Sequence, residues 1–285
     1  MAKDRRIRRQ LALAAVAEVA HRLGLNDAGA DVIADSNNVL VRLPGEDLVA
    51  KTSTSVLAGR RGVAALGREL RLGRRLAEHG VPIATPATGS VAGPHHAPGV
   101  VLTLWRYVRP DAKPDDGDRM LGEAVRHFHS ALADIVGELP ELTERIDRAN
   151  QLFQDAGATP GLAAADRALA GEAHSRLVPV VRSLDQTTAL HAEPHEDNVL
   201  WTERGPLLID FEAACRGPAE WDLAYLPPAA LASFPERDDT AIARLRAGIS
   251  FCVAAWCLAD PDPPPAVAEA ANVHWQALRG SWLVR

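Results

Sequence analysis

The chain has 285 residues, of which 47% are hydrophobic and 24% are charged, and its formal net charge is −6. This composition is that of a globular protein and excludes an intrinsically disordered chain. Its three cysteines, Cys215, Cys252 and Cys257, have no metal-binding spacing, which favours a reducing compartment, expected to be the cytoplasm. Basic residues exceed acidic ones over 1–105, and the reverse holds over 106–285. The first part therefore suits a polyanion such as a nucleotide, and the second suits metal ions or a cationic substrate.

The first hundred residues combine helical spacing with short β-like runs. The leading helix carries charges within its apolar run, which argues against a signal peptide. The β-like runs that follow are separated by polar turns, as in an antiparallel meander. We expect helices at 5–24 and 60–79, a meander within 30–54, and further strands at 86–92 and 99–108.

From residue 118 onward helical spacing dominates, interrupted by one non-helical island at 189–213. Strands followed by helices predict an α+β protein of two lobes, which we place at 1–105 and 106–285. No run of about 18 apolar residues is present, so no membrane span is expected. The expected helices are 118–137, 141–155, 161–183, 236–259 and 265–280.

The non-helical island contains the polar residues with the most specific chemistry. Asn198 and Asp210 each stand in a polar loop next to an apolar run, and oxygen ligands of this kind can converge on one hard cation. Phosphoryl transfer needs such a cation to neutralise the phosphates and a carboxylate to orient the attacking hydroxyl. The island therefore favours a phosphoryl-transfer site.

The pattern of this island resembles the aminoglycoside phosphotransferase family, whose members are relatives of the protein kinases. The matching residues are His191-x-Glu193-x4-Asn198, then Ile209-Asp210-Phe211-Glu212, then Gly217 to Ala224. The resemblance implies a two-lobed protein-kinase-like fold with a small antiparallel-sheet N-terminal lobe and a mostly helical C-terminal lobe. It implies that ATP or GTP with Mg²⁺ donates a phosphoryl group to a small-molecule hydroxyl. It assigns Asn198 and Asp210 to Mg²⁺, and His191 and Asp222 to structural support of the catalytic loop.

The first half matches the same family through residues that would bind the nucleotide. Lys51 is one of only three lysines beside 28 arginines, so its place in an apolar strand indicates a need for a compact ammonium group. The alternative is chance placement, with the amine reaching water. The resemblance implies that Lys51 holds the phosphates, that Glu69 is its ion-pair partner, that Asn37 and Asn38 lie in the phosphate-covering turn, and that Trp105 and Tyr107 belong to the hinge whose backbone recognises adenine.

Position 193 departs from the family pattern, which has an aspartate there. The extra methylene moves the carboxylate by about 1 Å, and a misplacement of that size can cost about a hundredfold in rate. Against this, the transition state of phosphoryl transfer is loose, so proton removal contributes little. Glu193 is therefore either a working base or the mark of a catalytically weak or silent nucleotide-binding protein.

A transition-metal site is a third interpretation, built on His191, Glu193 and His195. The usual two-histidine zinc motif needs a helix to place both rings on one face, and Pro194 argues against a helix. Glu212 is interpreted either as a second metal carboxylate or as a loop-capping acid.

Other sequence features bear on the partners. The tryptophans do not alternate with basic residues and the second part is acidic, so no nucleic-acid partner is expected. We expect instead a small-molecule acceptor, and the acidic second part makes a cationic amino sugar or amino alcohol plausible. A monomer or homodimer is expected. His127 and His129 are expected to be surface or packing residues, because positions two apart on a helix face different directions.

Overall fold

A computed structural model describes residues 2–35, 38–53, 59–260 and 262–284, with only the backbone described for 2–4 and 59–63. By their contacts the residues group into two compact units. Unit 1 comprises Met1–Ala124 and Glu196–Ala213, and unit 2 comprises Val125–His195 and Ala214–Arg285. The division into lobes at residue 105 stays a prediction. The compact units are defined by contacts, and unit 1 includes the later segment Glu196–Ala213.

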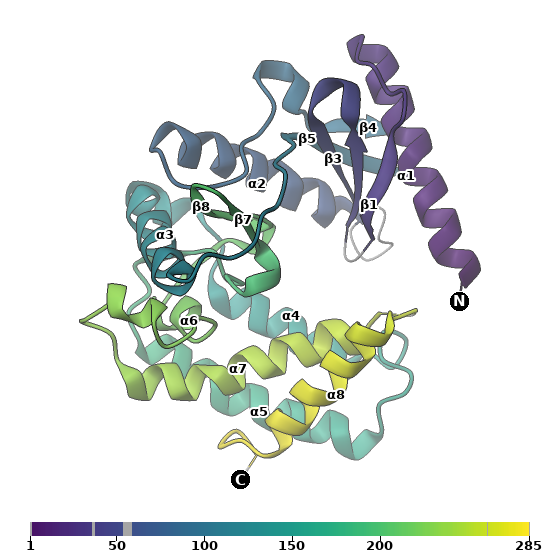
Figure 1. Cartoon of the computed structure of the whole chain (residues 1–285). Coiled ribbons are helices and arrows are strands. Elements are labelled where there is room, and N and C mark those ends of the chain that lie inside the picture. Colours follow the sequence, from purple (N-terminus) through teal and green to yellow (C-terminus); the bar gives the residue numbers. More distant parts are fainter. Residues whose placement is uncertain (1, 36–37, 54–58, 261, 285) are drawn as a thin grey trace. The chain divides into compact units, whose positions relative to one another are not determined.

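Unit 1 is built on a five-stranded antiparallel sheet with the strand order β1-β2-β3-β5-β4. Alternate residues of β2 are buried, as the two-residue period of a strand requires. Figure 1 shows the first helix along one face of the sheet and the second helix against the other. The elements are α1 (Ala2–Leu23), β1 (Asp31–Asp35), β2 (Val39–Leu43), β3 (Leu48–Ser53), α2 (Gly59–Glu78), β4 (His95–Ala97) and β5 (Val100–Arg106).

The strand predicted at 86–92 is wrong. Pro86 makes one isolated bridge with Trp105, and Gly89–Ala92 forms a short 3-10 helix. Gly89 has a φ of 59°, a left-handed conformation that interrupts an extended chain. The strand paired with β5 at this edge is instead β4.

A hairpin from the second half of the sequence completes unit 1. It consists of β7 (Val199–Thr202) and β8 (Gly205–Leu208). The N–H of Leu208 donates to the carbonyl of Pro82 (2.9 Å), and the N–H of Ala84 donates to the carbonyl of Leu208 (3.2 Å). These backbone bonds explain why the hairpin groups with the first part of the chain.

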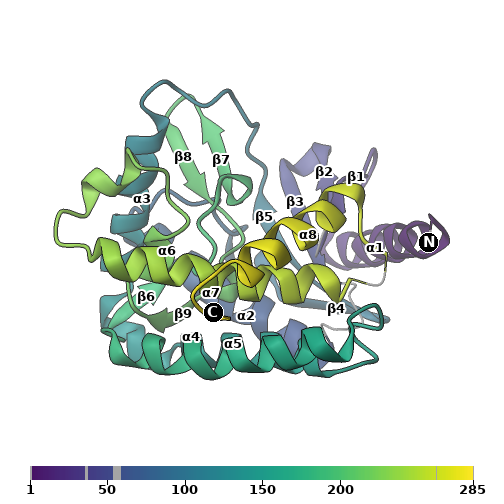
Figure 2. The same ribbon diagram turned by 90° about the horizontal axis from the view of Figure 1, so that it is seen from below.

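Unit 2 is mostly helical. Figure 2 shows α4 and α5 side by side, with α7 packed against α4 and paired with α8. The helix predicted at 118–137 ends early, since residues Ala133–Glu138 form a 3-10 helix. The elements are α3 (Gly117–Ala131), which begins in unit 1, then α4 (Leu142–Gln154), α5 (Ala164–Ser183), β6 (Thr188–Leu190), β9 (Cys215–Gly217), α6 (Glu220–Leu223), α7 (Asp239–Leu258) and α8 (Pro265–Arg279).

Helix α7 is the most apolar helix of unit 2. Within the part of the chain that the structure describes, it alone passes a length-and-hydropathy test for a membrane span, and 56% of its apolar window is buried inside the structure. Burial of this kind is also what a core helix of a globular unit shows.

Candidate functional site

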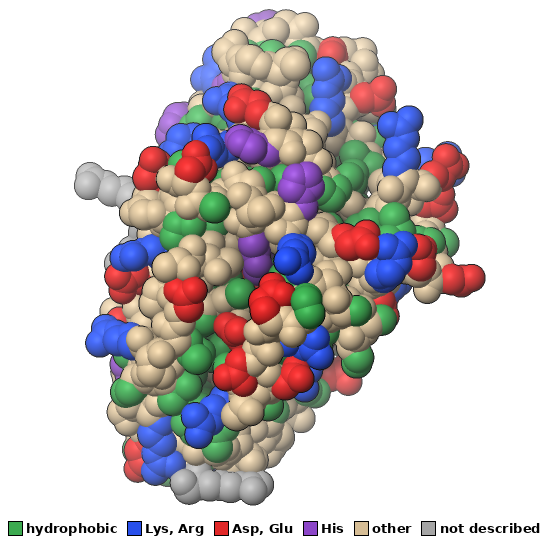
Figure 3. All heavy atoms as spheres, turned by 90° about the vertical axis from the view of Figure 1, so that its left-hand side faces the viewer, with side chains coloured by type: hydrophobic (Ala, Val, Ile, Leu, Met, Phe, Trp, Pro, Cys, Tyr) green, Lys and Arg blue, Asp and Glu red, His purple; other side chains and the backbone are tan. Residues whose placement is uncertain are grey.

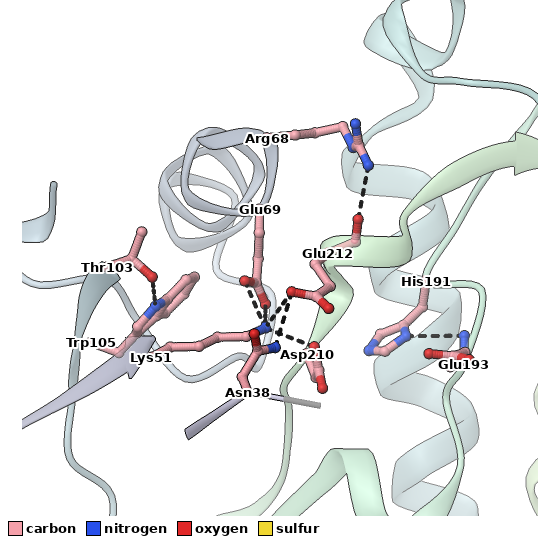
Figure 4. A network of polar contacts seen from close by, with 10 residues as sticks. All are labelled: Asn38, Lys51, Arg68, Glu69, Thr103, Trp105, His191, Glu193, Asp210 and Glu212. Carbon is pink, nitrogen blue, oxygen red and sulfur yellow. Dashed lines mark hydrogen bonds and ion pairs between the residues drawn. The ribbon is translucent and has the colours of Figure 1, made fainter. Parts of the chain in front are cut away.

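Lys51 lies at the centre of an ionic cluster in unit 1 (Figure 4), in which Lys51 and Glu69 are buried. Its ammonium nitrogen Nζ is 2.9 and 2.8 Å from the two carboxylate oxygens of Glu69. The same nitrogen is 2.7 Å from Oδ1 of Asp210 and 3.3 Å from Oε2 of Glu212. One ammonium group is therefore contacted by three carboxylates.

Local structure explains how these groups meet. Lys51 lies in β3, where it pairs with Thr103 of β5, and the side chains of this pair are buried. Glu69 lies on the face of α2 that also buries Leu66 and Leu70. Asp210 follows β8 with a φ of 59°, a conformation that costs a non-glycine residue of order 1–3 kcal/mol and persists only where its surroundings hold it.

The charges in this cluster do not balance. Burial alone lowers the pKa of Lys51, but the carboxylates of Glu212, Glu69 and Asp210 outweigh it and hold that pKa well above its ordinary value. Burial raises the pKa of Glu69 to about 8, against the opposing effect of Lys51, and Asp210 and Glu212 add to the rise. The ammonium group of Lys51 thus faces an excess of carboxylates, and such an excess attracts a further cation.

Two side chains of unit 1 hold the segment that contains Asp210. Nδ2 of Asn38 donates to Oε2 of Glu212 (3.2 Å), and Nη2 of Arg68 donates to the backbone carbonyl of Glu212 (2.9 Å). Glu212 therefore bonds to Asn38, just before β2, and to Arg68 on α2, as well as to Lys51. Asn37, predicted beside Asn38 in the phosphate-covering turn, lies outside the described residues.

The β7–β8 hairpin places the two predicted metal ligands at its open end. Asn198 precedes β7 and Asp210 follows β8, and the N–H of Ile209 donates to the carbonyl of Asn198 (3.0 Å). An amide oxygen and a carboxylate are ligands that suit Mg²⁺. This donor set and the excess of carboxylates fit a divalent cation held by Asn198 and Asp210.

The predicted hinge is largely engaged within unit 1. Nε1 of Trp105 donates to Oγ1 of Thr103 (2.9 Å), and its ring meets that of Phe211 edge-on at 5.9 Å. The N–H of Tyr107 donates to the carbonyl of Asp47 (2.8 Å), and that of the preceding Arg106 is also bonded. In this structure neither of these two N–H groups is available to an adenine ring.

The loop around Glu193 in unit 2 is organised by the buried carboxylate of Asp222. It accepts hydrogen bonds from the N–H groups of His191 and Ala192, both at 2.8 Å. Nε2 of His129 is also 2.8 Å from Asp222, and Nε1 of Trp221 donates to the carbonyl of Ala192 (3.1 Å). Ala192 has a φ of 77°, so these bonds hold a backbone conformation that alanine disfavours.

Glu193 follows this fixed backbone. Its N–H donates to Nδ1 of His191 (3.3 Å), and its carboxylate forms an ion pair with the guanidinium of Arg145 on α4. The ring of His195 lies 6.0 Å from that of Tyr225. Across the described ranges, no three or more His, Cys, Asp or Glu side chains form a cluster that could hold a metal ion, so the transition-metal interpretation gains no support.

Three residues of these networks were not assigned to them from the sequence. His129, expected to be a surface or packing residue, is a partner of Asp222, whereas His127 is exposed. Arg145 and Arg68 carry no spacing signal, since their partners lie 48 and 144 residues away. For His129, its place on the buried side of an amphipathic helix was the available signal.

The chain matches one protein family, described as the phosphotransferase enzyme family, over residues 32–266. No curated protein sequence matches it. Among solved structures it resembles the GDP and kanamycin complex of APH(2″)-IIia, at 17% identity and a TM-score of 0.68, covering 94% of this chain and 98% of that one.

Two further structures are similar. Amicoumacin kinase hAmiN, in complex with AMP-PNP, Ca²⁺ and Ami, shows 13% identity and a TM-score of 0.67, with 89% of this chain and 88% of that one covered. A choline/ethanolamine kinase family protein from Mesorhizobium loti shows 19% identity and a TM-score of 0.62, with 93% and 94% covered. At these identities the likeness shows the fold, and the predicted α+β protein-kinase-like fold is confirmed.

Proposed function

Because the chain belongs to the phosphotransferase enzyme family, we propose that it transfers the γ-phosphoryl group of ATP or GTP to a hydroxyl group of a small molecule. The observation that carries the proposal is the Lys51 cluster, where one buried ammonium meets Glu69, Asp210 and Glu212. An ammonium group presented beside surplus carboxylates suits the phosphates of a nucleotide together with the metal ion that accompanies them.

Four residues of unit 1 have distinct roles in the proposed function. Lys51 binds phosphate oxygens, and Glu69 keeps its ammonium in place. Asn198 and Asp210 hold Mg²⁺, which when bound neutralises charge on the phosphates. Similar structures named with AMP-PNP and Ca²⁺, or with GDP, support a nucleotide and a divalent cation.

In the proposed reaction Glu193 orients the acceptor hydroxyl. The hydroxyl oxygen forms the new bond to the γ-phosphorus, and the bond to the bridging oxygen breaks. The nucleoside diphosphate leaves with the electron pair, and the hydroxyl proton passes to the carboxylate. The bonds that Asp222 and Trp221 make to the backbone before Glu193 support this role, because a base must be held in place to orient a hydroxyl.

The acceptor is proposed to be a hydroxylated small molecule, and amino sugars and amino alcohols are the first candidates. Two similar structures are named with kanamycin and as a choline/ethanolamine kinase family protein, and these compounds carry both hydroxyl and cationic nitrogen groups. We propose a cytoplasmic monomer or homodimer that acts without nucleic acid or membrane.

Thermal unfolding with and without Mg²⁺ and ATP tests the nucleotide site. A ligand at a hundred times its Kd adds about 2.7 kcal/mol to stability, so we expect the Tm to rise by several degrees and the rise to require Mg²⁺. Asp210→Ala should abolish the rise. The exposed Glu203, in the turn of the same hairpin, supplies the control Glu203→Ala, which should keep it. Equal rises in both variants would contradict the assignment.

The alternative is a catalytically weak or silent nucleotide-binding protein. Glu193 in place of aspartate favours it, as does the ion pair that already engages its carboxylate. The two functions differ in turnover: an enzyme consumes ATP with an acceptor and loses this activity in Glu193→Gln while still binding nucleotide. If the wild type binds Mg²⁺ and ATP but neither phosphorylates an acceptor nor hydrolyses ATP, it is a catalytically silent nucleotide-binding protein.

A further inference from the structure

The ion pair between Arg145 and Glu193 joins parts of unit 2 that lie 48 residues apart in the sequence. Only 15% of the Arg145 side chain and 23% of the Glu193 side chain are exposed. The guanidinium of Arg145 also lies 5.5 Å from the ring centre of Trp256 on α7, within the range of a cation–π contact. Besides its ion pair with Glu193, Arg145 on α4 therefore contacts a side chain of α7.

Two groups beside this pair, Tyr225 and Cys252, are held in their neutral forms. Burial and the nearby carboxylate of Glu193 raise the pKa of Tyr225 well above its ordinary value. Burial raises the pKa of Cys252 to about 12, against the opposing effect of Arg145. Burial alone lowers the pKa of Arg145, but the carboxylate of Glu193 outweighs it and raises that pKa above its ordinary value.

The backbone before Glu193 cannot move the carboxylate freely. Asp222 accepts the N–H groups of the two preceding residues, and Ala192 is fixed at a positive φ. With the backbone held, the reach of the side chain at 193 depends on its length. A glutamate extends one methylene further than the aspartate expected there, and the structure places a guanidinium at the end of it.

We propose that Arg145 is a positioning residue for the acceptor-orienting carboxylate, and that the glutamate at position 193 is adapted to it. The guanidinium holds the longer carboxylate at a set place, so that glutamate in this chain performs the task of a shorter aspartate. This inference rests on the proposed phosphotransferase function. It adds Arg145 to that function as a residue that acts through Glu193, at a position that no motif marks.

The test is a double-mutant cycle with acceptor turnover as the readout. Arg145→Met should lower kcat by about a hundredfold, since a displacement near 1 Å has that effect, while the KM for ATP changes by less than about twofold. Arg145→Lys should restore part of kcat. Glu193→Asp should lower kcat in the wild type but add little in the Arg145→Met background, because the partner that the glutamate reaches is already gone.

Arg148 provides the matched control. It lies one helical turn further along α4, and its guanidinium is 5.7 Å from the same Trp256 ring. Arg148→Met should leave kcat within about twofold of the wild type. A thermal melt of each variant shows whether it is folded. If Arg145→Met is unfolded, Arg145→Lys, which keeps the charge, replaces it in the cycle.

Two results would overturn the proposal: an unchanged kcat in Arg145→Met, or a Glu193→Asp loss of equal size in both backgrounds. If the wild type transfers phosphate to no acceptor, the proposed function fails separately. Amide hydrogen exchange over residues 191–195 then decides about Arg145. Faster exchange in Arg145→Met than in Arg148→Met supports its hold on the loop, and equal exchange refutes it.

Discussion

At the scale of single residues, the Lys51 cluster is defined by its surplus of carboxylates. Glu69 is the most deeply buried of them, at 1% exposed, and burial of a carboxylate disfavours its charged form. The charges of Asp210 and Glu212 also raise this pKa. The pKa of Glu69 is therefore about 8, although Lys51 lowers it. Burial and the two acidic neighbours therefore favour the protonated form of Glu69, and Lys51 favours the charged form.

The proton on Glu69 predicts how stability depends on pH. The pKa rises from 4.5 in the unfolded chain to about 8 in the fold, so its contribution is fully present below pH 4.5 and is lost as the pH rises toward 8. Stability should therefore fall as the pH rises through this window. We expect Glu69→Gln to flatten this slope, as measured by urea unfolding at intervals from pH 5 to 8 in a chelating buffer.

Other groups titrate in the same pH range, so the prediction concerns the difference in slope between the wild type and Glu69→Gln. Glu78, at the exposed C-terminal end of the same helix, supplies the control Glu78→Gln, which should follow the wild-type slope. Identical slopes in the wild type and Glu69→Gln would show that Glu69 is already ionised throughout the window.

At the scale of elements, close packing of α7 supports the loop before Glu193. A Cβ at Gly248 would lie 2.9 Å from Cδ1 of Leu177 and 3.0 Å from the ring of Trp221. Trp221 is fully buried, and its indole N–H donates to the carbonyl of Ala192. The small residue on α7 therefore leaves room for the ring that holds the strained alanine.

Gly248→Ala should accordingly disturb both stability and the loop. Overpacking of a close-packed core costs about 1–3 kcal/mol, and the shift of Trp221 should lower turnover as well. Gly171→Ala on α5 is the control, since its Cβ would meet only the flexible end of Gln154 at 3.6 Å. Chemical denaturation and turnover measure both effects, and a Gly248→Ala protein as stable as Gly171→Ala would contradict the packing argument.

At the scale of the whole molecule, each unit collects its polar residues from distant parts of the chain. In unit 1 the cluster joins Lys51 to Asp210 across 159 residues, and in unit 2 Asp222 meets His129 across 93. The opposite charge balances of the two sequence halves do not appear as separate patches on the face drawn in Figure 3, where acidic and basic side chains are interspersed. The proposed function therefore rests on these specific contacts and not on the overall charge.

Hydrogen exchange with Mg²⁺ and a non-hydrolysable ATP analogue tests the cluster at this scale. Because a bound ligand suppresses local opening, we expect slower exchange both in β3 and in residues 196–213, although the sequence separates them widely. Helix α5 in unit 2 is the internal reference and should not change. Protection in only one of the two segments would contradict a nucleotide site that uses both.

The sequence by itself determined what depends on local spacing. The apolar runs of β2 and β3, the helical spacing of α4, α7 and α8, and the pattern from His191 to Asp222 were all readable, because each lies within a short stretch of chain. The same local reasoning failed at 86–92, where a strand was expected but Gly89 turns the chain. It also missed the role of His129, which depends on a partner far along the sequence.

Only the tertiary structure decided which distant side chains meet. The sequence did not show that Glu193 has a charged partner. Arg145 reaches Glu193 only because α4 packs beside it in unit 2. Arg68 reaches the carbonyl of Glu212 in the same way from α2. Contacts of this kind depend on how helices and loops pack, and the periodicity of a sequence carries no record of that packing.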